Sequence, residues 1–135
     1  MKRKYKLNQN ICYLCKYHIV WCSKYRRKVL VDKVRIRLEE LIIEICEPIN
    51  VDIIKLEIHP EYVYLQMQVD PQTGVHKVIK QIKSRTSRIL REEFPTLKTK
   101  LPTLWTNNYF ISTENKLQNE IVDDYIKTQK TSQRQ

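Results

Sequence analysis

The sequence is short of glycine and histidine. It contains one glycine and three histidines in 135 residues. A glycine-rich phosphate-binding loop needs several closely spaced glycines, so nucleotide-binding motifs of that kind are excluded. No order of serine, histidine and aspartate indicates a hydrolase triad either. The chemistry of this chain must therefore come from other residue types.

Long apolar runs are also lacking, since no 18 consecutive residues are apolar. A membrane-spanning helix needs about 20, and the N-terminal segment has no signal-peptide pattern. We therefore expect a soluble cytoplasmic protein without a membrane partner. The four cysteines are expected to be reduced. Cys12, Cys15 and Cys22 could share a zinc ion, but no second ligand pair follows at finger spacing.

Acidic residues are scarce in the first quarter of the chain. Residues 1–37 hold 12 lysines or arginines and one acidic residue, and the net charge of the chain is +10. A second basic run extends from Lys77 to Lys100. Localised positive charge favours a polyanion, usually nucleic acid, although a solubilising surface is the alternative. The residues that we expect to contact nucleic acid are Lys24, Tyr25, Arg26, Arg27, Lys28, Lys80, Lys83, Arg85 and Arg88.

Residues 62–69 show the alternation that is typical of a half-buried strand. One face is apolar and is expected to pack on helices; it carries Val63, Leu65, Met67 and Val69. The other face is polar and aromatic and is expected to be uncovered; it carries Tyr62, Tyr64, Gln66 and Gln68. In residues 51–58 the same alternation places Ile54, Leu56 and Ile58 on one face.

The expected elements follow the order β-α-β-β-α-β-α. We predict strands over residues 17–23, 51–58, 62–69 and 108–112, and helices over residues 32–46, 75–93 and 118–131. The segment between Pro95 and Pro102 is expected to be a loop. The first six elements form the split βαβ, ferredoxin-like pattern, an α+β fold with a four-stranded antiparallel sheet and two helices on one face. The last helix is additional. A basic arm (1–10), a single domain (11–131) and a tail (132–135) complete the expected organisation.

Five blocks of sequence resemble the signatures of one protein family. They are His59-Pro60-Glu61-Tyr62-Val63-Tyr64-Leu65; Tyr17-His18-Ile19-Val20-Trp21 followed by Lys24-Tyr25-Arg26; Val78-Ile79-Lys80-Gln81-Ile82-Lys83-Ser84 with Ser87-Arg88; Leu104-Trp105 with Tyr109-Phe110-Ile111-Ser112-Thr113; and Tyr125-Ile126-Lys127-Thr128-Gln129. The family is that of the single-tyrosine HUH transposases of small bacterial insertion sequences, the TnpA family. The blocks follow its order along nearly the whole chain.

The resemblance implies cleavage and rejoining of single-stranded DNA that carries imperfect hairpins at transposon ends. In this family a tyrosine of the last helix attacks a backbone phosphate and forms a 5′-phosphotyrosine link, which makes Tyr125 the implied nucleophile. A divalent metal, Mg²⁺ or Mn²⁺, polarises the phosphate, and Gln129 matches one of its ligands. The proteins are homodimers. Without the resemblance, the spacing of Tyr125 and Gln129 would indicate a half-buried core aromatic and an edge residue.

The two histidines of the family's metal site are tyrosines here, Tyr62 and Tyr64. A tyrosine hydroxyl with a pKa near 10 is a poor metal ligand, so we expect the metal to be bound weakly or not at all and cleavage to be impaired. His59 shares the polar strand face and is a possible substitute ligand; a solvent-exposed hairpin histidine is the alternative. The glycine that the family usually has after the fourth strand is missing from Thr113-Glu114-Asn115-Lys116.

The sequence therefore favours a transposase-family dimer that binds hairpin-bearing single-stranded DNA with impaired cleavage. Three functions are weighed, of which the third is the least favoured. The first is an active transposase that acts through Tyr125. The second is a catalytically silent DNA-binding protein that uses its basic patches. The third is a module that binds RNA or single strands by stacking bases on Tyr62 and Tyr64. The resemblance also implies that the tyrosine helix of one subunit can complete the site of the other.

Overall fold

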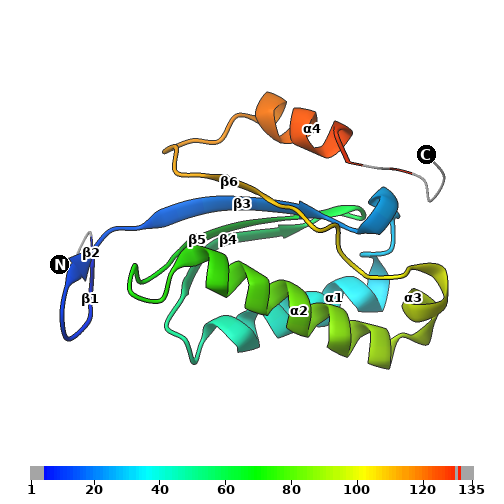
Figure 1. Ribbon diagram of the computed structural model, residues 1–135, viewed down its shortest axis with the longest axis horizontal. Helices are drawn as coiled ribbons and strands as arrows, with labels where there is room; N and C mark the ends of the chain where they lie inside the picture. Colours follow the sequence, from blue (N-terminus) through cyan, green and yellow to red (C-terminus); the bar gives the residue numbers. More distant parts are fainter. Residues whose placement is uncertain (1–4, 130, 132–135) are drawn as a thin grey trace.

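A four-stranded antiparallel sheet is the centre of the computed structural model, which describes residues 5–129 and 131 (Figure 1). Its strands are β3 (Lys16–Cys22), β4 (Asp52–Ile58), β5 (Tyr62–Gln68) and β6 (Phe110–Ser112), in the spatial order β4-β5-β3-β6. That order, with helical crossovers, is the split βαβ arrangement, so the predicted α+β fold is confirmed. The predicted tail, residues 132–135, lies outside the described residues.

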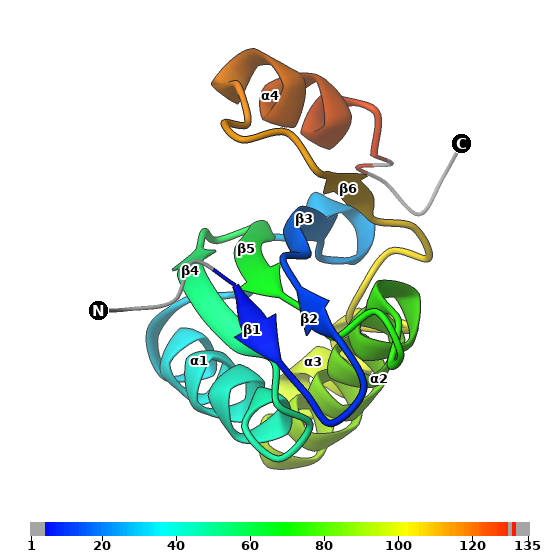
Figure 2. The same ribbon diagram turned by 90° about the vertical axis from the view of Figure 1, so that its left-hand side faces the viewer.

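Two helices, α1 (Asp32–Cys46) and α2 (Val75–Glu93), cover one face of the sheet (Figure 2). The single glycine, Gly74, precedes α2 with a φ of 87°, a conformation that residues with a side chain rarely adopt. A short helix, α3 (Pro95–Lys100), stands where we expected a loop, and the 3₁₀ turn η1 (Lys24–Arg26) follows β3. None of the helices in the described part of the chain has the length and apolar character that a membrane crossing requires.

The segment predicted as a basic arm contains the strand β1 (Lys6–Leu7). This strand pairs with β2 (Cys12–Tyr13) in a small hairpin at one end of the molecule (Figure 1). Lys6 also forms an ion pair of 2.8 Å with Asp52 of β4. The backbone pairing and the ion pair attach part of the arm to the rest of the fold.

The main core lies between the sheet and the pair α1 and α2. The apolar residues of β5 that we expected to face the helices, Val63, Leu65, Met67 and Val69, are all buried there. Trp21 of β3 is fully buried and meets Trp105 edge to face, with ring centroids 5.8 Å apart. The alternating pattern of the sequence thus assigned this face of β5 correctly.

Ile54 is an exception to the expected alternation in β4. It is 46% exposed, whereas its neighbour Ile53 packs against the core with Leu56 and Ile58. The register of β4 against β5 shifts between Ile53 and Lys55, which marks a β-bulge. A bulge inserts one extra residue into the strand and reverses the side-chain parity beyond it. The prediction that Ile54 shares a face with Leu56 is therefore wrong.

The prediction that the second sheet face is uncovered is also wrong. The last helix, α4 (Asn119–Lys127), lies across this face (Figure 1). Its Ile126 is buried with Val20 and Cys22 of β3, and the half-buried Tyr62 and Tyr64 pack against this cluster. Because α4 is amphipathic, burying its apolar side on the sheet is favourable.

Thr86→Val is expected to lower the free energy of unfolding by about 1–3 kcal/mol, because it leaves a buried donor without a partner. The buried Thr86 hydroxyl accepts a hydrogen bond of 3.0 Å from the Trp105 indole N–H and donates one of 2.7 Å to the carbonyl of Ile82. Urea denaturation measures the effect. Thr99→Val, the same change at an exposed position of α3, is the control. Equal destabilisation by both variants would contradict the prediction.

Candidate nucleic-acid interface and tyrosine site

Tyr125 lies on α4 with its ring tilted against Phe110 of β6, at a centroid distance of 5.8 Å. Its hydroxyl donates a hydrogen bond of 2.8 Å to the side-chain oxygen of Asn108. Burial, reinforced by the nearby Cys22, raises the pKa of Tyr125 well above its ordinary value of about 10. The phenol is therefore protonated at neutral pH, and a nucleophilic attack would require another group to accept its proton.

Gln129, one turn beyond Tyr125, is buried. Its amide nitrogen donates to the backbone carbonyl of Tyr125 at 3.2 Å and to the Thr128 hydroxyl at 3.0 Å. Gln129 also lines a cavity of about 250 Å³. The other residues around this cavity are Lys24, Tyr25, Thr106, Asn107, Asn108 and Thr128.

Tyr62 and Tyr64 line a different cavity, of about 120 Å³, together with His59 and Glu57. The rings of Tyr62 and His59 are stacked, with centroids 4.2 Å apart and planes at 10°. His59 also lies 3.3 Å from a carboxylate oxygen of Glu57. Burial raises the pKa of both tyrosines, so the two phenols are neutral at neutral pH. The structure thus brings His59 and the two tyrosines together and places Gln129 elsewhere.

His18 belongs to this site, although the sequence analysis did not identify it as a site residue. Its Nε2 is 2.7 Å from the carbonyl oxygen of Glu114, and its Nδ1 is 2.6 Å from the Tyr64 hydroxyl. A carbonyl only accepts, so Nε2 of a neutral imidazole carries the hydrogen, and Nδ1 accepts the hydrogen bond that Tyr64 donates. His18 shares a strand face with Val20 and Cys22, but only the register of β3 against β5 reveals the contact with Tyr64.

These donors do not fit a Mg²⁺ or Mn²⁺ site as they are arranged. Both phenols are neutral, and the Tyr64 hydroxyl is already hydrogen-bonded to His18. Gln129 lines another cavity. Within residues 5–129 and 131, no three histidine, cysteine, aspartate or glutamate side chains gather as a metal site would need, and this includes Cys12, Cys15 and Cys22.

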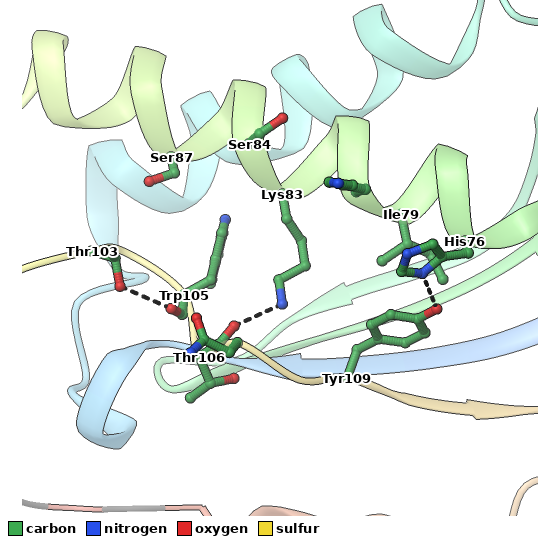
Figure 3. A pocket seen from close by; sticks show the side chains of 11 residues that line it. His76, Ile79, Lys83, Ser84, Ser87, Thr103, Trp105, Thr106 and Tyr109 are labelled. Carbon is green, nitrogen blue, oxygen red and sulfur yellow. Dashed lines mark hydrogen bonds between the residues drawn. The ribbon is translucent and has the colours of Figure 1, made fainter.

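Basic residues of η1 and α2, which are distant in sequence, lie on either side of one segment, residues 106–108. A cavity of about 410 Å³ lies between this segment and α2 (Figure 3), and Lys80 and Lys83 line it. It shares Thr106 and Asn107 with the cavity that Lys24 and Tyr25 line. Four of the predicted nucleic-acid residues, two from η1 and two from α2, therefore flank the same segment from two sides.

The nine predicted nucleic-acid residues differ in their exposure and in the ion pairs or hydrogen bonds that their side chains already form. Arg27 and Lys28 are exposed, whereas Arg26 forms an ion pair of 3.3 Å with Glu61. On α2, Arg85 is half-buried and Lys83 is bonded to backbone carbonyls. The exposed Arg88 has Glu92 at 3.9 Å, a surface pair that stabilises little.

The backbone of η1 is strained. Tyr25 and Arg26 have φ values of 58° and 53°, in the left-handed region that residues with a side chain seldom occupy. The turn is held by the Ser23 hydroxyl, which donates to the carbonyl of Arg27, and by the amide of Lys24, which donates to the carbonyl of Leu104 at 2.7 Å. Such strain costs about 1–3 kcal/mol for each residue and is concentrated at functional sites.

The family model described as IS200-like transposase matches residues 11–129, which include every element from β2 to α4. The chain belongs to the IS200-like transposase family. The ISDra2 transposase TnpA of Deinococcus radiodurans is 30% identical over 126 residues, which are 92% of this chain and 90% of that protein. The transposase of insertion sequence element IS200 from Salmonella typhimurium is 32% identical over 85% of this chain and 76% of its own length.

Solved structures of transposases resemble this family member in fold. The crystal structure of a putative transposase from Deinococcus radiodurans has a TM-score of 0.85 and 29% identity, and the match covers 94% of this chain and 99% of that one. A REP-associated tyrosine transposase bound to a REP hairpin has a TM-score of 0.57 and 14% identity, and covers 90% of this chain and 67% of its own. The second likeness is one of fold alone.

Proposed function

We propose that this IS200-like transposase binds hairpin-bearing single-stranded DNA in the cytoplasm as a homodimer, and that its strand cleavage through Tyr125 is strongly impaired. The nucleophile position of the family is retained, since Tyr125 and Gln129 stand one turn apart at the end of the domain. The positions that hold the metal in the family carry Tyr62 and Tyr64. Binding is therefore the activity that this chain keeps.

The observation that carries the DNA-binding part is the meeting of two basic elements at residues 106–108. Lys24 lies on one side of the segment and Lys80 on the other. Lysine and arginine at such a surface contact phosphates, which fix the position of a nucleic acid without reading its bases. A fold relative, the REP-associated tyrosine transposase, is bound to a REP hairpin, and this agrees with a hairpin as the proposed partner.

The chemistry at the predicted metal positions supports the impaired cleavage. Tyr62 and Tyr64 keep their protons at neutral pH, and the Tyr64 hydroxyl is committed to His18. Base stacking on Tyr62 and Tyr64, the alternative from the sequence, is disfavoured because both rings pack beneath α4. DNA binding through phosphate contacts needs neither a bound metal ion nor exposed tyrosine rings, so it agrees with both observations.

Fluorescence anisotropy tests the proposal with a labelled single-stranded hairpin oligonucleotide, a fully paired duplex of equal length and an unstructured single strand. We expect tighter binding to the hairpin strand, and a Kd that changes by less than about twofold when EDTA replaces Mg²⁺ or when Tyr125→Phe is introduced. Equal affinity for all three nucleic acids, or loss of binding in EDTA, would contradict the proposal.

A further inference from the structure

Lys83 reaches from α2 to the segment that leads into β6. Its ammonium nitrogen donates to the backbone carbonyls of Thr106 at 2.7 Å and of Asn108 at 3.0 Å; Figure 3 shows the side chain extended toward Thr106. The side chain is partly buried, and this burial lowers the pKa of Lys83 to about 8. An ammonium group in this position makes charge-assisted hydrogen bonds, which are stronger than those of a neutral amine.

The same segment is held from its other side by β3. The Thr106 amide donates to the carbonyl of Cys22 at 3.1 Å, and the Thr106 hydroxyl donates to the same carbonyl at 3.3 Å. The side chain of Asn108, two residues on, accepts the hydrogen bond from Tyr125. A continuous series of contacts therefore runs from Lys83 through the backbone of residues 106–108 to the hydroxyl of Tyr125.

We propose that Lys83 is a positioning residue for Tyr125: its ammonium group fixes the backbone of Asn108, and thereby the acceptor that holds the tyrosine hydroxyl. Lys83 is not in contact with Tyr125 and acts on it through the backbone of residues 106–108 and the side chain of Asn108. The arrangement holds the phenol in one orientation whether or not Tyr125 attacks DNA. It therefore stands independently of the proposed function.

Deprotonation of Lys83 weakens both of its hydrogen bonds, so the position of Asn108 depends on pH. Other titratable groups surround Lys83. Cys22 of β3 has a pKa raised to about 12 by burial and is uncharged near neutrality. The Tyr109 ring centroid lies 6.0 Å from the ammonium, and His76, 2.8 Å from the Tyr109 hydroxyl, lines the same cavity together with Lys80. Variants of His76 and Lys80 separate the effect of these two side chains from that of Lys83.

The test is the NMR signal of the Tyr125 ring in protein that carries ¹³C-labelled tyrosine, assigned by its loss in Tyr125→Phe and followed from pH 6.5 to 9.5. We expect a transition with a midpoint near pH 8. Tyr125 itself does not ionise in this range, because burial raises its pKa. Lys83→Met should abolish the transition, and Lys83→Arg should hold the signal near its low-pH position. Lys80→Met and His76→Gln should keep the midpoint.

Asn108→Ala provides a second test that keeps Lys83 and both backbone carbonyls. It removes the side chain that joins the segment to Tyr125, so the transition should disappear although Lys83 still titrates. A Tyr125 signal that does not change between pH 6.5 and 9.5 in the native protein would overturn the proposal. This result needs only the native protein, so it holds even if Lys83→Met does not fold. A transition that persists in Asn108→Ala or in folded Lys83→Met would overturn it as well.

Discussion

Restoring histidine at both tyrosine positions, with Tyr62→His and Tyr64→His together, is expected to raise the affinity for Mn²⁺ by at least about 100-fold. Hydrogen-bond partners that only orient a metal ligand already change metal affinity by about 10–100-fold. The double substitution supplies two ligands directly, so its effect should be at least as large. A neutral imidazole offers a nitrogen lone pair at neutral pH, whereas the two half-buried phenols keep their protons. Isothermal titration calorimetry with Mn²⁺ measures the change.

Tyr62→Phe with Tyr64→Phe is the matched control, because it removes both hydroxyls and adds no ligand. Residue 64 lies beside His18, so His18→Gln in the double-histidine protein shows whether His18 becomes a ligand. The restored protein is also expected to form a covalent DNA adduct that disappears with Tyr125→Phe. Unchanged Mn²⁺ affinity in the double-histidine protein would show that the scaffold itself, and not only these two side chains, departs from a metal site.

Neutralising two exposed cations beside η1, with Arg27→Gln and Lys28→Gln, is expected to weaken DNA binding about tenfold at moderate salt. Each phosphate contact that is lost should reduce the slope of log K against log salt by about one. The slope should therefore fall in magnitude by about two. Arg26 is left unchanged because it is paired with Glu61, and its loss would also leave that carboxylate without its partner.

The control for this pair removes the same charge away from η1, with Lys16→Gln at the start of β3 and Arg35→Gln on α1, both at exposed positions. Anisotropy titrations at several salt concentrations compare the two double variants. A specific interface predicts that the control variant has nearly the native slope of log K against log salt. Equal losses in both variants would show that net charge alone, and not the surface beside η1, attracts the DNA.

The strands and both long helices could be predicted from the sequence because their patterns are local. Val63, Leu65 and Met67 alternate with polar residues, and this alternation alone identifies the buried face of β5. Ile54 shows the limit of the same rule. The β-bulge beside it depends on how β4 pairs with β5, and nothing in the residue types of β4 indicates it.

The candidate site was predictable in its residues but not in its arrangement. The resemblance identified Tyr125, Gln129, Tyr62 and Tyr64. The placement of Gln129 at one cavity and of the tyrosine pair at another follows from where α4 docks on the sheet. The amphipathic pattern of α4 shows that one side must be buried, but not which surface covers it.

Lys83 and Asn108 illustrate a second limit. From sequence, Lys83 counted as one more cation on a basic helix face. Its role depends on a hydrogen bond to a carbonyl 25 residues away and on a lowered pKa, both of which need the folded backbone. Asn108 was expected only as the first residue of a strand, and its side-chain contact with Tyr125 joins two elements that are distant in sequence.

A covalent-adduct assay on the native protein tests the central claim most directly. The protein is mixed with labelled single-stranded hairpin DNA, with and without Mn²⁺ or Mg²⁺, and each sample is run on a native gel and on a denaturing gel. Binding without cleavage predicts a shifted band on the native gel in all conditions and no protein–DNA band on the denaturing gel. A denaturant-stable band that requires the metal and disappears in Tyr125→Phe would contradict the account.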